Sequence, residues 1–234
     1  MSKITKIWTK IRRKWMKIRL QPISVFCLHH VCEEFDTEFM NECDWMQLDE
    51  FKSKVQSMQQ DGIEFISISK AYKHICNDWI RCKKYAVITF DDGYASLNEI
   101  LPWLEEKHLP VTLFINGKYL DGKSYRKNPK EQYLKHNELF ALTSPLVEIG
   151  SHGWEHTDAS QISPIEFAES IERNVSLLST HLRYVPFHAY TWGQHTEASD
   201  KILADLKIIP VLIDGAKNYH VCLSVHRELI THHT

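Results

Sequence analysis

Residues 85–93 read Tyr-Ala-Val-Ile-Thr-Phe-Asp-Asp-Gly. The first six are almost all apolar and include β-branched and aromatic residues, a composition typical of a strand buried on both faces of a parallel sheet. Asp91 and Asp92 are therefore expected at the carboxyl end of this strand. Because successive side chains at a strand end point in different directions, one carboxylate can bind a cation while its neighbour faces a substrate. Gly93 allows the backbone to turn there without a Cβ penalty.

A second polar motif follows another expected strand, at residues 146–149, and reads Ser-His-Gly-Trp-Glu-His over residues 151–156. His152 and His156 can meet on one face if the segment makes a helical turn. Neutral imidazole is a preferred ligand of zinc and of neighbouring first-row divalent ions. Two histidines and one aspartate leave coordination positions open, as a catalytic metal requires. The pattern predicts a mononuclear metal site, with zinc as the preferred ion.

Each motif alone is weak evidence, because Asp-Gly is a common turn signal and the chain has 14 histidines. Together, Thr-Phe-Asp-Asp-Gly at 89–93 and Ser-His-Gly-Trp-Glu-His-Thr at 151–157 resemble the polysaccharide deacetylases, also called the NodB-homology domain. The resemblance extends from about Val25 to about Leu229. It implies a hydrolase that removes N-acetyl groups, or O-acetyl or N-formyl groups, from amino sugars. It also implies Asp91 as general base and Asp92, His152 and His156 as metal ligands.

The third motif of that family departs from its usual pattern in this chain. The matching stretch, residues 189–193, reads Ala-Tyr-Thr-Trp-Gly, so the arginine that orients the base in the family falls on Ala189. A backbone N–H near Trp192 remains a candidate oxyanion donor, because that role needs no particular side chain. Trp154, Trp192 and Tyr190 are also candidates for stacking against a sugar ring, although buried aromatics more often belong to the core. What holds Asp91 in place is left open.

Two histidines are candidates for the general acid that protonates the leaving amine. The stretch Leu-His-His-Val at 28–31 resembles the early His-His arrangement of the poly-N-acetylglucosamine deacetylases, which favours His29. His226 is the competitor, because many members of the family use a Leu-x-His near the end, and residues 223–226 read Leu-Ser-Val-His. His30 is expected to be a structural histidine bonded to a neighbouring group.

The whole chain favours a single α/β domain. Its 234 residues are 43% hydrophobic, and no linker or repeat divides them, so residues 21–234 are expected to form one domain after a separate segment at 1–20. Alternating strand and helix patterns favour βα units around a parallel sheet. The resemblance implies a distorted, incomplete (β/α) barrel. Expected strands lie at 23–28, 63–68, 85–90, 111–116, 146–149, 185–190, 208–213 and 220–225.

Residues 1–20 form a basic, amphipathic segment. They hold eight of the 28 Lys and Arg residues and no acid, which leaves 20 basic against 30 acidic residues in the remainder. Such a segment is typical of a helix at a membrane surface, whereas a helix that covers the barrel or mediates a dimer is an equal alternative. It is too short and too charged to span a bilayer, and it lacks the apolar core of a secretory signal. We expect a cytoplasmic protein with a candidate contact at the inner face of the membrane.

The motifs, the charge distribution and the resemblance bear on three candidate functions. The leading prediction is a metal-dependent deacetylase acting on an N-acetylated amino sugar of a polysaccharide or glycan precursor. The alternative, motivated by Ala189, is a catalytically impaired carbohydrate-binding or scaffold protein of the same fold. Nucleic-acid binding is disfavoured because the chain beyond the basic segment is acidic and has no known binding motif. The six cysteines show no Cys-x-x-Cys pair and are expected to be reduced thiols.

Overall fold

The computed structural model describes residues 20–33, 45–124, 132–219 and 224–230. Of the basic segment at 1–20, only Leu20 is among them, so its predicted helix lies outside the described residues. Cys43 and Cys222 also lie outside, and the four cysteines that are described are free thiols. Among the described residues, no helix has the length and apolar character that a membrane span requires.

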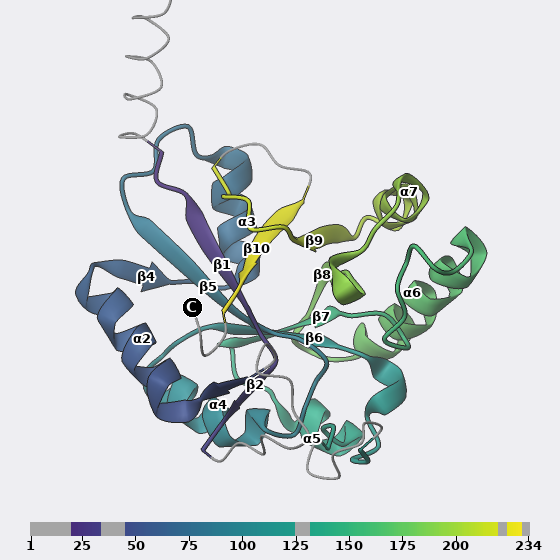
Figure 1. Ribbon diagram of the computed structural model, residues 1–234, viewed down its shortest axis with the longest axis horizontal. Helices are drawn as coiled ribbons and strands as arrows, with labels where there is room; N and C mark the ends of the chain where they lie inside the picture. The colour runs from purple at the N-terminus through teal and green to yellow at the C-terminus, as the bar shows by residue number, and fades with distance from the viewer. Residues whose placement is uncertain (1–19, 34–44, 125–131, 220–223, 231–234) are drawn as a thin grey trace, which may run out of the picture.

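Seven parallel strands close into a ring, with an eighth strand attached outside it (Figure 1). The strands follow the order β1-β10-β9-β8-β7-β6-β5-β4, and β1 also pairs with β5, which closes the ring and leaves β4 outside on the edge of β5. The sheet consists of β1 Ile23–Leu28, β4 Ile63–Phe65, β5 Lys84–Phe90, β6 Val111–Ile115, β7 Val147–Ser151, β8 Tyr184–Ala189, β9 Ile209–Ile213 and β10 Val225–Leu229. This architecture confirms the predicted distorted (β/α) barrel, with seven strands where a complete barrel has eight.

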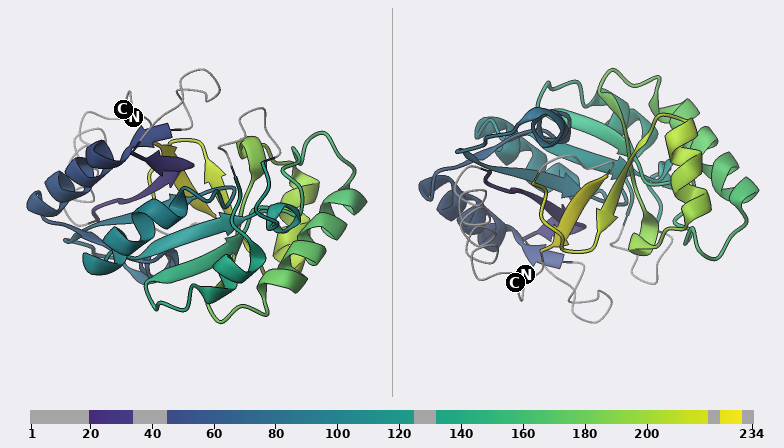
Figure 2. Two further views of the ribbon diagram at one scale, coloured as in Figure 1. Left: turned by 90° about the horizontal axis from the view of Figure 1, so that it is seen from below. Right: turned by 90° about the horizontal axis from the view of Figure 1, so that it is seen from above.

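Helices surround the ring (Figures 1 and 2). Figure 1 shows α2 and α4 on one flank of the ring and α6 and α7 on another. The α-helices are α2 Leu48–Gln60, α3 Ile68–Asn77, α4 Leu97–Glu106, α5 His136–Ala141, α6 Pro164–Leu178 and α7 Glu197–Asp205, and the short 3₁₀ helices are η2 Gly117–Tyr119 and η3 Thr191–Gly193. A two-stranded sheet of β2 His30–Cys32 and β3 Trp45–Gln47 lies apart from the ring.

Alternation along the strands divides the core into two layers. In β5, Tyr85 and Val87 pack with residues of β1, β8, β9 and β10 in one buried cluster, which fills the inside of the ring. Ala86, Ile88 and Phe90 pack instead with α2 and α4 in a second cluster, between the ring and its helices. Because side chains alternate between the faces of a strand, Asp91 continues the inward-facing series that contains Val87 and Thr89.

The strands that the structure describes in full lie within a few residues of their predicted positions. Most of the strand predicted at 220–225 lies outside the described residues, because 220–223 are not among them. The described part of this region forms β10, at Val225–Leu229. Because Arg227 is 1% exposed and lies in β10, this strand adds a buried cation to the ring.

Candidate active site

A pocket of about 170 Å³ opens at the carboxyl ends of the strands. It is bounded by residues that follow β1, β5, β7 and β8 and by residues within β9 and β10. This is the end of a parallel barrel where enzymes of this architecture place their catalytic groups. The lining residues are His29, Asp91, Asp92, His152, His156, Tyr190, Trp192, Gly193, Ile213, Arg227 and Leu229.

The backbone separates the two neighbouring aspartates into different positions. Asp92 adopts a left-handed conformation, with φ of 69°, which aspartate tolerates better than most residues. The Asp92 carboxylate faces both His152 and His156, whereas the Asp91 carboxylate faces Arg227. Asp91 and Asp92 are 3% and 2% exposed, so both charges depend on protein partners.

Asp92, His152 and His156 converge as the sequence predicts. The Asp92 Oδ1 lies 3.3 Å from the His152 Nε2 and 3.2 Å from the His156 Nε2. The His152 Nδ1 donates a hydrogen bond to the Ala189 carbonyl at 2.7 Å, which in a neutral ring directs the lone pair of Nε2 toward Asp92. A carboxylate oxygen and imidazole lone pairs facing one another need a cation between them, so this donor set fits a divalent metal.

The loop that carries the two histidines reaches this geometry without the helical turn on which the prediction depended. Residues 152–158 contain no helix. Asn116 donates to the carbonyls of His152 and Gly153, and the Trp154 N–H donates to the Ser170 Oγ of α6. The loop is therefore held by hydrogen bonds to Asn116, directly after β6, and to Ser170 of α6, which the sequence of the loop does not encode.

Arg227 resolves the question of what orients Asp91. Its Nη1 and Nη2 donate to the two carboxylate oxygens of Asp91 at 2.5 and 2.8 Å, a bidentate ion pair inside the ring. Nη1 also donates to the Thr89 Oγ1 at 3.2 Å. Burial raises the pKa of Asp91, but the charges of Arg227 and His152 and the bond from Arg227 outweigh it and lower this pKa to about 2. Asp91 is therefore a carboxylate over the physiological range of pH.

The structure separates the two candidates for the general acid. His29 lines the pocket, and one of its ring nitrogens lies within 4.8 Å of an Asp91 oxygen. His226 is the neighbour of the inward-facing Arg227, so it points to the other side of β10, where its Nδ1 lies 2.8 Å from the Asp214 Oδ2. His30 is buried, bonds to the Ser96 Oγ and stacks on Tyr94, in agreement with the expected structural role.

Trp192 and Tyr190 occupy different environments at the rim. Trp192 is 64% exposed, has a φ of 57° and places its ring edge-to-face with His156 at 4.8 Å. Tyr190 is buried, and its hydroxyl donates to the Asp200 Oδ1 at 2.9 Å. Trp192 therefore offers an open aromatic face beside the proposed ligands, whereas the Tyr190 hydroxyl already serves a structural bond.

Sequence reasoning missed Arg227 and Cys27. Cys27 is buried in β1, and its thiol donates to the Asp91 Oδ2 at 3.4 Å. A signal for Arg227 existed in the alternation of Val225, Arg227 and Leu229 with polar residues, since an arginine in an inward position of a strand needs a buried partner. For Cys27 the sequence held no signal beyond an apolar setting.

Comparisons with known proteins identify the family and the fold. A model of the polysaccharide deacetylase family matches residues 80–211. The structure of IcaB from Ammonifex degensii superposes with a TM-score of 0.75 at 22% identity, covering 90% of this chain and 92% of that chain. The deacetylase PplD from Streptococcus pyogenes, solved in complex with acetate, gives 0.75 at 20% identity, with 91% and 93% covered.

A de-N-acetylase from Aggregatibacter actinomycetemcomitans also gives a TM-score of 0.75, at 16% identity, over 92% of this chain and 97% of that chain. At these identities the structural likenesses establish the fold. A comparison with curated protein sequences found no match. The family match spans more than half of the chain and includes Asp91, Asp92, His152 and His156. The chain therefore belongs to the polysaccharide deacetylase family, and it is a hydrolase that acts on carbon–nitrogen bonds of carbohydrates.

Proposed function

We propose that this protein is a metal-dependent N-deacetylase in which Asp92, His152 and His156 hold one divalent ion and Asp91 is the general base. The main support for the proposal is that two adjacent carboxylates have different partners. Asp92 faces two imidazole nitrogens, whereas Asp91 is held by Arg227 beside them. Zinc suits a site of one carboxylate and two imidazoles, and other first-row divalent ions share this preference.

In the proposed reaction, water adds to the acyl carbon and the carbon–nitrogen bond breaks, which yields a carboxylic acid and a free amine. A bound divalent ion supplies Lewis acidity, since it lowers the pKa of a coordinated water to ~7 and polarises a carbonyl oxygen. Asp91 takes a proton from the attacking water. Arg227 fixes the direction of the Asp91 carboxylate and keeps it ionised, which is the role that the third motif assigns to another arginine in the family.

His29 is the proposed general acid, which donates a proton to the departing nitrogen. It lines the pocket on the side of Asp91, so an acyl group beside the ligands would lie between His29 and Trp192. The exposed ring of Trp192 is suited to stacking against a sugar. The proposed substrate is an N-acetylated amino sugar in a polysaccharide or glycan precursor. The acetate found with the streptococcal deacetylase is consistent with release of an acetyl group.

The alternative of a binding protein without turnover rested on the missing arginine at position 189. Arg227 places a guanidinium on Asp91 from β10, which removes the main reason for that alternative. A protein that only binds sugar also has no need of an ionised carboxylate beside the metal ligands.

Acetate release from N-acetylglucosamine oligomers tests the proposal. Wild-type protein is compared before metal removal, after chelation and after zinc is restored, together with Asp91→Asn and the exposed control Asp49→Asn. We expect chelation to abolish release, zinc to restore it, Asp49→Asn to match wild type and Asp91→Asn to lose activity by ~10²-fold or more. Release that survives both chelation and Asp91→Asn would exclude the proposed chemistry.

The basic segment at residues 1–20 supports a second, separate proposal about location. We propose that this segment contacts the inner face of the membrane, because basic residues and tryptophans recur in it at helical spacing. Sedimentation with anionic liposomes should be lost when residues 1–20 are removed. Equal sedimentation of the two proteins would contradict the contact.

A further inference from the structure

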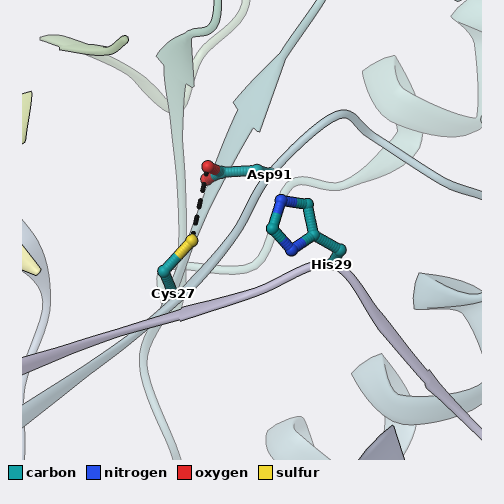
Figure 3. A group of neighbouring side chains, drawn as sticks. All are labelled: Cys27, His29 and Asp91. Atoms are coloured by element: carbon teal, nitrogen blue, oxygen red, sulfur yellow. Dashed lines mark hydrogen bonds between the residues drawn. The ribbon is translucent and has the colours of Figure 1, made fainter. Parts of the chain in front are cut away.

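A second group of metal-binding side chains lies beside the proposed ligands and is formed by Cys27, His29 and Asp91 (Figure 3). Each offers one ligand atom, and these atoms lie within 4.8 Å of one another. Figure 3 shows the Cys27 thiol bonded to Asp91 with the His29 ring beside them. Asp91 and His29 act in the proposed reaction, whereas the buried Cys27 thiol has no role in it.

We propose that Cys27, His29 and Asp91 form a second, weaker site for a thiophilic divalent cation such as zinc. Thiolate sulfur, imidazole nitrogen and carboxylate oxygen are the three donor types that zinc prefers. The 3.4 Å between the Cys27 Sγ and the Asp91 Oδ2 fits the roughly 3–4 Å that separates ligand atoms around a tetrahedral zinc ion. Within the described part of the chain, the buried Nδ1 of His29 has no hydrogen-bond partner, so no bond at that nitrogen ties the ring to another role.

Binding at this site replaces a proton with a metal ion. The Cys27 S–H bond breaks, its proton leaves to solvent and a sulfur–metal bond forms, while Asp91 exchanges its bond from the thiol for a bond to the ion. The Asp91 Oδ2 accepts from both the thiol and the Arg227 Nη2, so the ion takes the place of the thiol at this oxygen. The 2.5 Å bond from the Arg227 Nη1 to the Oδ1 can be kept throughout. The ion thus enters between groups that are already in place.

Charge sets the order in which the two sites fill. The guanidinium of Arg227 is hydrogen-bonded to both carboxylate oxygens of Asp91, so it repels a cation bound there most strongly. The site of Asp92, His152 and His156 therefore fills first. The two sites are adjacent, because the His152 Nε2 of the first site lies 3.9 Å from the Asp91 Oδ2 of the second.

Occupancy of the second site should inhibit the enzyme, since it engages both the proposed base and the proposed acid. This consequence rests on the proposed function, whereas the binding itself does not. Excess zinc is therefore expected to lower acetate release below the rate measured with one equivalent. In Cys27→Ser, the same excess should inhibit less, with each protein compared with its own rate at one equivalent.

Cobalt(II) gives a readout that is independent of activity. Metal-free full-length protein is titrated with cobalt while near-ultraviolet absorption is followed, because thiolate-to-cobalt charge transfer occurs there and the first site has no sulfur ligand. We expect the visible band of the first site to rise with the first equivalent and the charge-transfer band to rise only with the second. Cys27→Ser should lose the charge-transfer band and one equivalent of bound cobalt but keep the visible band.

The exposed cysteine Cys82 provides the matched control, because Cys82→Ser removes a thiol that does not line the pocket. This variant should keep the charge-transfer band. A band that follows Cys82, or a wild-type protein without any such band, would overturn the second site. If near-ultraviolet circular dichroism shows that Cys27→Ser does not fold, the second site is tested by the wild-type titration and by Cys27→Ala. This variant should also lose the charge-transfer band. Binding of the second equivalent without inhibition would keep the site and contradict the proposed roles of Asp91 and His29.

Discussion

Asp91 is held by a guanidinium that comes from β10 instead of from the loop after β8. Two short sequence motifs contain Asp91, Asp92, His152 and His156. Because each motif is local, these four residues could be predicted from the sequence. The alternation in β10 indicates a buried Arg227, but its pairing with Asp91 could not be predicted, because the contact joins positions 136 residues apart and depends on how the ring closes. In the ring, β1 lies between β5 and β10, and Arg227 reaches Asp91 across the inside.

Substitution of Arg227 should affect catalysis through the pKa and the direction of Asp91. Arg227→Lys keeps the charge but loses the bidentate bond, so we expect kcat/KM to fall by about 10- to 100-fold. Arg227→Met should raise the pKa of Asp91 and move the acidic limb of the kcat/KM profile to higher pH. The measurement is a pH–rate profile, with Arg183→Lys as control. A profile that does not move in Arg227→Met would show that Arg227 only stabilises the fold.

The short helix η3 places Trp192 at the mouth of the pocket and depends on a glycine. Gly193 has a φ of 67°, and a Cβ on it would lie 2.2 Å from the Ile213 Cγ2. At this scale the sequence predicted part of the structure. The capping box of α6 joins Ser163 and Glu166, which are three residues apart, so it is encoded locally. The position of η3 was not predictable, because the contact of Gly193 with Ile213 of β9 determines it.

Gly193→Ala should displace η3 and with it Trp192 and the neighbouring His156. Because small displacements of catalytic or binding groups are costly, we expect kcat/KM to fall by about 10- to 100-fold. Gly215→Ala is the matched control, since Gly215 has the same φ of 67° but no atom within 4 Å of an added Cβ. The control should lose some stability and keep its activity. Equal losses of activity in both variants would mean that backbone strain, and not the clash with Ile213, causes the effect.

In the whole molecule, the buried charges of Asp91 and Arg227 share the inside of the ring with an apolar cluster. The sequence predicted the class of fold because alternating strands and helices encode it locally, and it predicted the carboxyl-end location of the site. It did not predict that β1 pairs along its full length with β5 but at only two positions with β10. It also gave no reason to bury His188, which is 2% exposed and bonds to the Ser151 Oγ.

His188 should make the stability of the whole fold depend on pH. Burial and the charges of His152 and Arg227 lower its pKa from 6.5 to about 3. Because the folded pKa lies below the unfolded one, the unfolded state binds the proton first, and stability present above the unfolded pKa is lost as pH falls toward the folded pKa. Lowering the pH from 7 to 5 should therefore reduce the free energy of unfolding by ~1–2 kcal/mol through His188. Denaturant unfolding of His188→Gln should show a weaker decline, and an equal decline would contradict the assignment.

We expect one metal ion to bind to Asp92, His152 and His156 while Asp91 stays outside the coordination sphere as the base. Anomalous diffraction from crystals of the full-length protein, grown with one equivalent of zinc, tests it most directly. We predict a single peak bounded by the Asp92 carboxylate and the Nε2 atoms of His152 and His156, with Asp91 still paired with Arg227. A peak coordinated by Asp91 in place of Asp92, or no peak among these three residues, would contradict it.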